Sequence, residues 1–338
     1  MLKSKSPGVR ITTDAIHRRY IISKNTRNHT EHTNRHQGGN TMRILIYGAG
    51  VIGSFYASRF AKAGLDVTVL ARGQRLKELQ GHGLWYRGKT RTHKVEVKTI
   101  SELKPNDRYQ FIFLTVRENQ VEEALEDISR NESPNVVTMV NTIKSYGRWE
   151  KICGKGRILP AFPGAGGCIE GGILDAQLLP RAIQPTTFGE IGGRKTSREE
   201  ALEYIFRKSH IPYQIVPEMH HWQISHLGVI VPLADAYYQS RHPEKICANE
   251  KLMTLTAYRI KKNLKWIAQK GMLCPAKLYM IKDMPTGMLA GVLSRAYQSE
   301  FGNKFLYRHA MHAPEEFQRL HQEFYNYMKT HTKESNKA

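Results

Sequence analysis

The segment from residue 42 to residue 72 restricts the fold most, because it combines a glycine pattern with short apolar runs. It opens with an apolar run at residues 44–47, which is too short for a helix and is typical of a buried strand. The sequence GAGVIG follows at once and has the spacing G-x-G-x-x-G. A helix is expected at residues 55–63, with Gly64 as its C-terminal cap, and a second strand at residues 67–70. We therefore predict a strand–helix–strand unit.

Each glycine of this motif has a physical role in binding a dinucleotide. Gly48 permits the tight turn, Gly50 lets the backbone approach a pyrophosphate, and Gly53 allows close packing of helix on sheet. The N-terminus of the helix presents free N–H groups and its positive dipole end to the phosphates. The fold predicted here is therefore Rossmann-type, and a glycine turn that binds nothing is the alternative. The predicted cofactor-binding residues of the motif are Gly48, Ala49, Gly50, Val51, Ile52 and Gly53.

The residues after the second strand indicate which nicotinamide nucleotide this motif binds. An NAD site usually ends that strand with Asp or Glu, which accepts a hydrogen bond from the ribose 2′-hydroxyl. Here Ala71 and Arg72 follow the strand, and the first carboxylate is Glu78. A guanidinium attracts a 2′-phosphate and donates charge-assisted hydrogen bonds to it. We expect NADP(H) as the cofactor and Arg72 as one of its ligands, with an ordinary solvated arginine as the alternative.

Length, cysteine content and hydropathy narrow the class of protein. The chain has 338 residues, 40% of them hydrophobic, which allows two domains with substantial cores. Its four cysteines form no C-x-x-C pair, so we expect free thiols and a reducing compartment. No apolar stretch approaches the length of a membrane span, and the first residues lack the apolar core of a signal peptide. These features favour a soluble, cytoplasmic protein with no membrane partner.

The formal net charge of +21 raises the question of nucleic-acid binding. Residues 1–41 hold eight Lys and Arg against two acidic residues, and the remaining excess is spread over residues 42–338 without a nucleic-acid motif. An anionic cofactor and substrate need part of this charge, and solubility can account for the rest. We expect no nucleic-acid partner. Residues 1–41 are polar and aperiodic, which predicts a disordered basic extension ahead of a natural start at Met42.

The α/β pattern continues to residue 217. Strands are expected at residues 111–116, 136–140 and 213–216, shorter β-like runs at residues 158–162, 173–179 and 186–191, and a hairpin-like excursion at residues 83–97. Helices are expected at residues 74–80, 118–130 and 197–208, the last with Ser197 and Glu200 as a capping box. We therefore assign residues 42–217 to one NADP-binding domain.

Residues 218–338 have a different character, because helical patterns are separated by prolines and glycines. These patterns cover residues 219–240, 249–270, 286–298 and 313–330. They predict an all-α C-terminal domain that binds substrate or forms a dimer. Ligands of open α/β folds bind beyond the carboxyl ends of the strands. The active site should therefore lie where residues 48–53, residues 116–120 and Asn141 face the helical domain.

Several of these motifs resemble those of the ketopantoate reductase (2-dehydropantoate 2-reductase) family. They are GAGVIG at residues 48–53, ARGQRL at residues 71–76, LTVRENQ at residues 114–120 and Asn141 after the next strand. The resemblance implies a Rossmann domain plus a helical domain, with hydride transfer from NADPH to a 2-keto acid in the cleft, as in pantothenate biosynthesis. It also implies that Arg117, Gln120 and Asn141 contact the cofactor.

The chain departs from the family pattern at the residues that would contact substrate. The family has Lys at the position of Arg117, which keeps the positive charge and can bind a carboxylate or phosphate with two hydrogen bonds. Alignment on Pro232 puts Gln223, Leu227 and Val231 where the family has a catalytic Lys and two Asn. No ammonium stands there to protonate the developing alkoxide. The resemblance thus implies a divergent member with an altered proton donor and a more apolar pocket.

Hydride transfer to a ketone needs a proton donor near the carbonyl. Gln223 can polarise a carbonyl but cannot supply a proton. His226 lies three residues further on the same helical face and is the candidate acid, with a packing role as the alternative. We expect Gln223, His226, Arg117 and Asn141 to form the catalytic group. The histidines match no zinc ligand spacing, so no metal is expected.

Two functions stay open. The first is an NADPH-dependent oxidoreductase that reduces a small 2-keto acid or a related ketone, and Arg117, Gln120 and Asn141 favour it. The second is a non-catalytic NADP(H)-binding regulatory protein, which Gln223 favours. A small keto compound is the expected partner, and a homodimer is compatible with either function.

Overall fold

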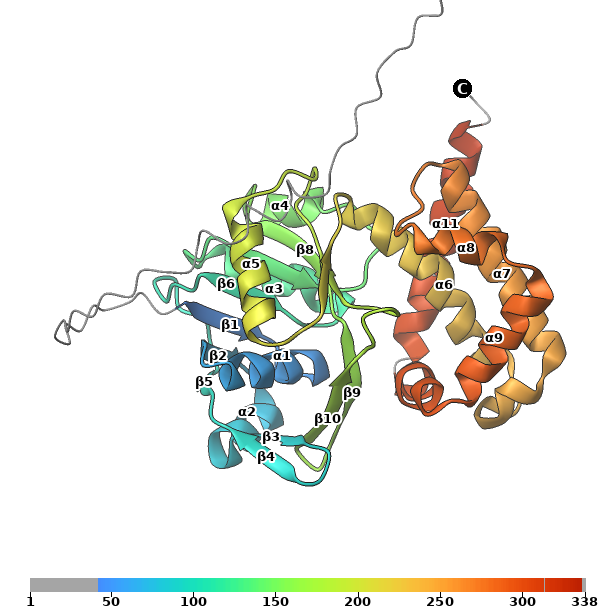
Figure 1. The fold of residues 1–338 in the computed structure, drawn as a ribbon. Helices are drawn as coiled ribbons and strands as arrows, with labels where there is room; N and C mark the ends of the chain where they lie inside the picture. The colour runs from blue at the N-terminus through green and yellow to red at the C-terminus, as the bar shows by residue number, and fades with distance from the viewer. Residues whose placement is uncertain (1–41, 313, 336–338) are drawn as a thin grey trace, which may run out of the picture. The chain divides into compact units, whose positions relative to one another are not determined.

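The structure is a computed structural model that describes residues 42–312 and 314–335 (Figure 1). The predicted extension at residues 1–41 lies outside these residues. Within them, no helix combines the length and apolar character needed to span a bilayer.

A sheet of eight strands forms the centre of the first half of the described chain (Figure 1). Its strands are β1 (Arg43–Tyr47), β2 (Asp66–Leu70), β5 (Lys98–Ile100), β6 (Phe111–Leu114), β7 (Val136–Met139), β8 (Ile158–Phe162), β11 (Thr186–Phe188) and β12 (Tyr213–Ile215). They lie in the order β12-β11-β8-β7-β6-β1-β2-β5. The strands from β8 to β5 are parallel to one another, and β11 is antiparallel to β8. The predicted Rossmann-type arrangement is confirmed.

Helices cover both faces of this sheet. They are α1 (Val51–Lys62) and α5 (Ser197–Lys208) on one face, and α3 (Val121–Ser129) and α4 (Gly147–Cys153) on the other. Alternate residues of β1 separate the two faces, as the pleat of a strand requires. Ile44 and Ile46 pack in the apolar cluster with α1 and α5, whereas Leu45 and Tyr47 pack in the cluster with α3 and α4. This burial on both faces explains why β1 is apolar throughout.

The glycine motif begins a helix earlier than expected. The predicted start of the helix at residue 55 is wrong, because α1 begins at Val51 and includes Gly53 in its first turn. Close packing against the strand ends stabilises a glycine that intrinsic propensity disfavours in a helix. At the other end, Gly64 has φ +72° directly after Ala63, so the predicted left-handed glycine is confirmed.

A second sheet joins segments that are distant in the sequence. It contains β3 (Leu84–Arg87), β4 (Thr92–Val95), β9 (Ala165–Glu170) and β10 (Ile173–Leu178), in the order β4-β3-β10-β9. The pair β3–β4 is antiparallel, so the predicted hairpin at residues 83–97 is confirmed. The helix α2 (Gly73–His82) precedes β3 and matches the helix expected at residues 74–80.

Helices make up the rest of the described chain. They are α6 (Met219–Gln239), η3 (Pro243–Ala248), α7 (Glu250–Gln269), α8 (Lys277–Asp283), α9 (Thr286–Gln298), η4 (Gly302–Tyr307), α10 (Arg308–His312) and α11 (Pro314–Ser335). They have an apolar cluster of their own, with Leu227, Leu264 and Phe324 completely buried. The predicted all-α C-terminal region is confirmed, while the exact boundary at residue 217 stays a prediction.

The capping box expected at Ser197 and Glu200 is wrong. The residue that caps α5 is Thr196, whose hydroxyl accepts a hydrogen bond from the backbone N–H of Glu199 at 3.3 Å. The Thr196 hydroxyl also donates to Glu190, a carboxylate that lies outside the helix. The capping-box spacing could not include this partner, because Glu190 precedes Thr196 by six residues and lies outside the helix, after β11.

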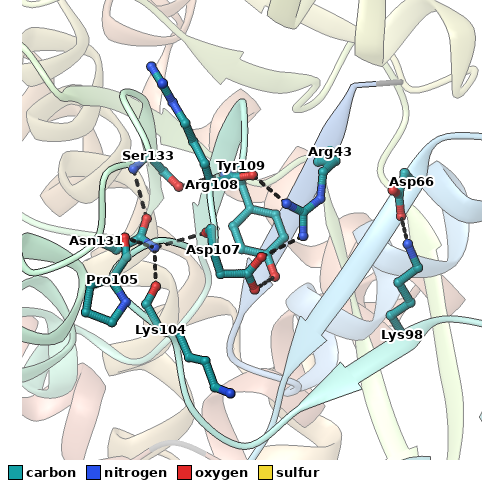
Figure 2. A network of polar contacts seen from close by, with 10 residues as sticks. All are labelled: Arg43, Asp66, Lys98, Lys104, Pro105, Asp107, Arg108, Tyr109, Asn131 and Ser133. Atoms are coloured by element: carbon teal, nitrogen blue, oxygen red, sulfur yellow. Dashed lines mark hydrogen bonds and ion pairs between the residues drawn. The ribbon is translucent and has the colours of Figure 1, made fainter. Parts of the chain in front are cut away.

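A polar network anchors Arg43 at the amino-terminal end of β1 (Figure 2). The glycine motif follows the other end of this strand. Arg43 forms an ion pair with Asp107 at 2.7 Å and donates to the carbonyl of Arg108. The buried Asn131 amide donates to the carbonyls of Lys104 and Asp107 at 2.7 and 3.0 Å. These bonds hold the loop before β6 against the start of β1, so they stabilise the register of the two strands.

Candidate functional site

Three loops meet at the carboxyl edge of the sheet. They follow the neighbouring parallel strands β1, β6 and β7, and they contain the glycine motif, Arg117 with Gln120, and Asn141. The Thr115 hydroxyl connects the first two loops by donating to the carbonyl of Gly48 at 2.9 Å. The structure therefore brings together the segments that the sequence placed at one site.

The backbone of the glycine motif has the geometry of a phosphate cradle. Gly48 has φ +110°, which is unfavourable for other residues. A Cβ atom at Gly53 would lie 1.9 Å from the Gly48 carbonyl oxygen, so the helix packs too closely for any side chain. At Gly50, by contrast, no atom of the described residues other than its two chain neighbours lies within 4 Å of such a Cβ. No side chain caps the start of α1 at Gly50, so its first N–H groups are available to an anion.

Arg75 holds the glycine-motif loop by hydrogen bonds, a role that no motif in the sequence predicts. Its guanidinium donates to the Ala49 carbonyl at 3.3 Å and to the Ser54 hydroxyl at 3.2 Å. Ser54 in turn donates to the same Ala49 carbonyl at 2.9 Å. A further bond reaches the Gly172 carbonyl between β9 and β10. Arg75 is therefore a positioning residue that fixes the loop and connects it to the second sheet.

Arg72 lies at the edge of the cradle as the N-cap residue of α2. Its guanidinium donates to the Tyr47 hydroxyl at 3.0 Å and forms ion pairs with Glu123 at 3.5 Å and Asp127 at 3.6 Å. Tyr47 donates to Asp127 at 2.7 Å. Burial and this bond to the carboxylate raise the pKa of Tyr47, so the hydroxyl keeps its proton. The arrangement holds Arg72 in place, but with two carboxylates beside it.

Arg117 and Gln120 belong to the turn that leads into α3. The helix expected at residues 118–130 begins with one 3₁₀ turn, η2 (Glu118–Gln120), before α3. The Arg117 backbone N–H donates to the Gln120 side-chain oxygen at 3.3 Å, and both residues are exposed. Their roles in cofactor and substrate contact stay predictions.

Asn141 follows β7 and carries an unsatisfied acceptor. Its Oδ1 atom is buried and has no hydrogen-bond partner among the described residues. A buried polar atom without a partner costs about 1–3 kcal/mol, so such atoms often mark a place for a ligand or water. This observation fits a role in binding a ribose, a nicotinamide amide or a substrate hydroxyl.

Gln223 is deeply buried near the start of α6, and both ends of its amide are engaged. Its nitrogen donates to the Val140 carbonyl at 2.9 Å, and its oxygen accepts from the Tyr146 hydroxyl at 2.9 Å. Burial raises the pKa of Tyr146, which keeps this donor protonated. Gln223 therefore ties α6 to the loop after β7. Leu227 and Val231, one and two turns further, lie in the apolar cluster of the helical region.

His226 is the next candidate on α6. Its ring stacks on Trp222, with centroids 5.1 Å apart and an interplanar angle of 9°, and lies 4.5 Å from the Phe162 ring. His220 instead places Nε2 2.9 Å from the Ile143 carbonyl, and burial lowers its pKa. His226 thus lies against the end of β8, while His220 is bound to the loop after β7. The role of His226 as an acid stays a prediction.

Sequence reasoning missed a charged cluster between the loops and α11. Lys144, three residues after Asn141, lies 2.7 Å from Glu118 and 3.4 Å from Glu323. Arg319 lies 3.4 Å from the same Glu118 carboxylate. Burial lowers the pKa of Lys144, but its carboxylate neighbours outweigh this effect and raise the pKa overall. No motif predicts the cluster, because it combines residues from three separate elements.

No metal site is present among the described residues, in the sense that no three His, Cys, Asp or Glu side chains gather in a group that could hold an ion. The groups at the edge of the sheet that can bind an anion are backbone N–H groups, guanidiniums and amides, although Glu123 and Asp127 lie beside Arg72. This donor set suits an anionic nucleotide.

Comparison with known proteins identifies relatives of the first half of the chain. A 2-dehydropantoate 2-reductase from Mesorhizobium japonicum is 28% identical over 138 residues, which are 40% of this chain and 38% of that protein. A 2-dehydropantoate 2-reductase from Lactococcus lactis is 30% identical over 122 residues, which are 35% of this chain and 39% of that protein. The chain thus spans about two fifths of the length of the curated relatives that it matches.

The fold extends this similarity beyond the aligned segments. The crystal structure of 2-dehydropantoate 2-reductase from Geobacter metallireducens superposes with a TM-score of 0.61 at 17% identity. The superposition covers 85% of this chain and 98% of that one. At this identity the likeness concerns the fold, and it includes the helical region. The family model described as Ketopantoate reductase PanE/ApbA matches residues 44–190, so the expected resemblance to this family is confirmed over this part of the chain.

Proposed function

We propose that the protein is an NADPH-dependent oxidoreductase that reduces a small 2-keto acid or a related ketone. The open space at Gly50, above the uncapped start of α1, carries this proposal. Residue 50 is where a bound pyrophosphate approaches the backbone in a G-x-G-x-x-G loop. The 2-dehydropantoate 2-reductases that match this chain support ketopantoate as the first substrate to test.

The residues at and near the carboxyl edge of the sheet have separate tasks in this proposal. The cofactor supplies the hydride when it is bound. Asn141 uses its unpaired Oδ1 to accept a hydrogen bond from nucleotide or substrate. Arg117, exposed in the loop after β6, binds the substrate carboxylate. His226 supplies the proton for the alkoxide, and Gln223 acts through its neighbours, because both ends of its amide are already bonded.

The second candidate is a protein that binds NADP(H) for regulation and has no catalysis. Gln223 favours it, because a buried, fully bonded amide stands where the family has a catalytic ammonium. In this version α6 and the loop after β7 respond to the nucleotide as one connected unit.

Oxidation of NADPH with a panel of 2-keto acids, including ketopantoate, separates the two candidates. Turnover on any of them supports the first. Tight NADPH binding without turnover on the whole panel supports the second. Absence of any calorimetric signal on NADPH titration at low salt contradicts both.

The proton donor is tested with His226→Ala, and His221→Ala on the same helix serves as the control. We expect His226→Ala to lower kcat/KM at least tenfold with little change in NADPH affinity, because general acid catalysis contributes about 10²–10⁴-fold. The control should keep its turnover. Equal turnover of the two variants and the parent would remove His226 from the mechanism.

A further inference from the structure

We propose that two carboxylates on α3, Asp127 and Glu123, limit the preference of the cofactor site for NADPH over NADH. They do so by competing with the 2′-phosphate for Arg72. This inference rests on the proposed nucleotide binding, but it does not depend on turnover.

The guanidinium of Arg72 already has anionic partners within the described part of the chain. Glu123 lies 3.5 Å and Asp127 3.6 Å from its terminal nitrogens. The Tyr47 hydroxyl lies between them, because it accepts from Arg72 and donates to Asp127. Arg72 and the two acids together carry a net charge of −1. A 2′-phosphate that binds here must therefore compete with these carboxylates for the guanidinium and then remain close to them.

The same groups affect NADH in the opposite direction. A ribose 2′-hydroxyl can donate a hydrogen bond to a carboxylate, which is how NAD sites recognise it at the end of the second strand. In this chain the acids reach that region from α3 instead of from β2. Arg72 can thus bind the 2′-phosphate of NADPH, and its acidic neighbours can accept a hydrogen bond from the 2′-hydroxyl of NADH. The sequence near Arg72 shows the cation, but it does not show the two carboxylates that the fold places beside it.

The two acids differ in how strongly they should act. The Asp127 side chain is 29% exposed and is held by Tyr47, whereas the Glu123 side chain is 77% exposed. Solvent and salt screen exposed pairs, so Glu123 interacts weakly with any charge at this site. Asp127 is partly buried and fixed in direction, and it should account for most of the effect.

The experiment measures the dissociation constants of NADPH and NADH by calorimetry at low salt for the parent and for Asp127→Asn and Glu123→Gln. Glu126→Gln is the matched control, because it removes the same charge from an exposed position on α3 that does not contact Arg72. The quantity compared is the ratio of the NADH constant to the NADPH constant. Asp127→Asn should raise it about fivefold and Glu123→Gln about twofold or less, with no change in Glu126→Gln.

The expected parent binds NADPH more tightly than NADH by no more than about tenfold. A parent preference of several hundredfold would overturn the inference, and so would an Asp127→Asn ratio equal to that of Glu126→Gln. Where Asp127→Asn melts at a lower temperature, Asp127→Ser gives the same comparison. If neither nucleotide binds the parent, the proposed function fails together with this inference. If both bind but no substrate turns over, only the reductase assignment fails and the ratio still decides.

Discussion

Two glycines of the same motif should respond to alanine in opposite ways. Gly53 has no room for a methyl group, because its Cβ would lie 1.9 Å from the Gly48 carbonyl and 2.5 Å from the Thr115 hydroxyl. Gly50 has open space and φ −69° with ψ −167°, a conformation that alanine adopts without strain. Gly53→Ala should therefore damage the fold, and Gly50→Ala should damage binding alone.

The size of each effect follows from these contacts. In Gly53→Ala the Gly48 carbonyl must move by about 1 Å, and such overpacking costs about 1–3 kcal/mol. The obstacle is backbone, so we expect the upper end, reduced by about 1 kcal/mol for the better helix propensity of alanine. A net loss of about 2 kcal/mol lowers Tm by about 4–8 °C for a domain of this size. Gly50→Ala should change stability by less than about 0.5 kcal/mol.

Calorimetric melting and NADPH titration of both variants test this reasoning. Gly50→Ala should keep the parent Tm and lose at least tenfold in NADPH affinity, about 1.4 kcal/mol, because the methyl group occupies the space of the pyrophosphate. Gly53→Ala should melt early. A Gly50→Ala variant that binds NADPH like the parent would refute the cradle, and equal melting of both variants would refute the packing argument.

Three further changes test other parts of the structure. Glu190 is buried with Arg198, and although burial raises the pKa of this carboxyl, hydrogen bonds from Arg198 and Thr196 outweigh burial and lower the pKa overall. Glu190→Gln should therefore lower the free energy of unfolding by about 3–5 kcal/mol at pH 7, measured by urea unfolding. This loss should shrink as the pH falls below about 4.5, because the parent carboxylate then becomes protonated. A deficit independent of pH would contradict this sign. Asn131→Asp should lower Tm more than Asn131→Ala does, because a carboxylate would face the carbonyl oxygens of Lys104 and Asp107 (Figure 2). The NADPH affinity of both variants should stay unchanged. Equal losses of Tm in the two variants would contradict the role of the Asn131 amide as a donor. Asn141→Ala should leave Tm unchanged or raise it, because it removes a buried acceptor without a hydrogen-bond partner. The KM for NADPH or for the keto substrate should rise at least threefold. A clear drop in Tm would contradict a ligand-binding role for the Asn141 oxygen.

Local chemistry explains why the first strand–helix–strand unit was predictable. The apolar run of β1, the glycine spacing and Gly64 each have one physical meaning within a few residues of sequence. The start of α1 was misplaced for the same reason. Helix propensity is local, whereas the close packing that holds Gly53 in the helix comes from Gly48 and Thr115.

The second sheet shows where local patterns fail. The strand β9 contains Gly166, Gly167 and Cys168, a composition that predicts a loop. It forms because β10 pairs with it across its whole length and β10 also pairs with β3, about ninety residues earlier in the chain. Pairing between such distant segments leaves no period in either sequence. The short helices α4 and α8 were missed because seven residues are too few to display a helical period.

At the candidate site, too, features set by neighbouring residues could be predicted from the sequence, whereas contacts from other elements could not. The groups that Gly50 and Arg72 offer to a ligand, backbone N–H groups and one cation, could be predicted from the sequence, while the ligands themselves stay a prediction. The neighbours that modify those ligands, Asp127 beside Arg72 and Tyr146 beside Gln223, come from other elements. They matter because a cation's affinity for phosphate depends on every anion that already surrounds it. A motif reports which groups are present at a site, and only the fold reports how much of their charge and hydrogen bonding is still available to a ligand.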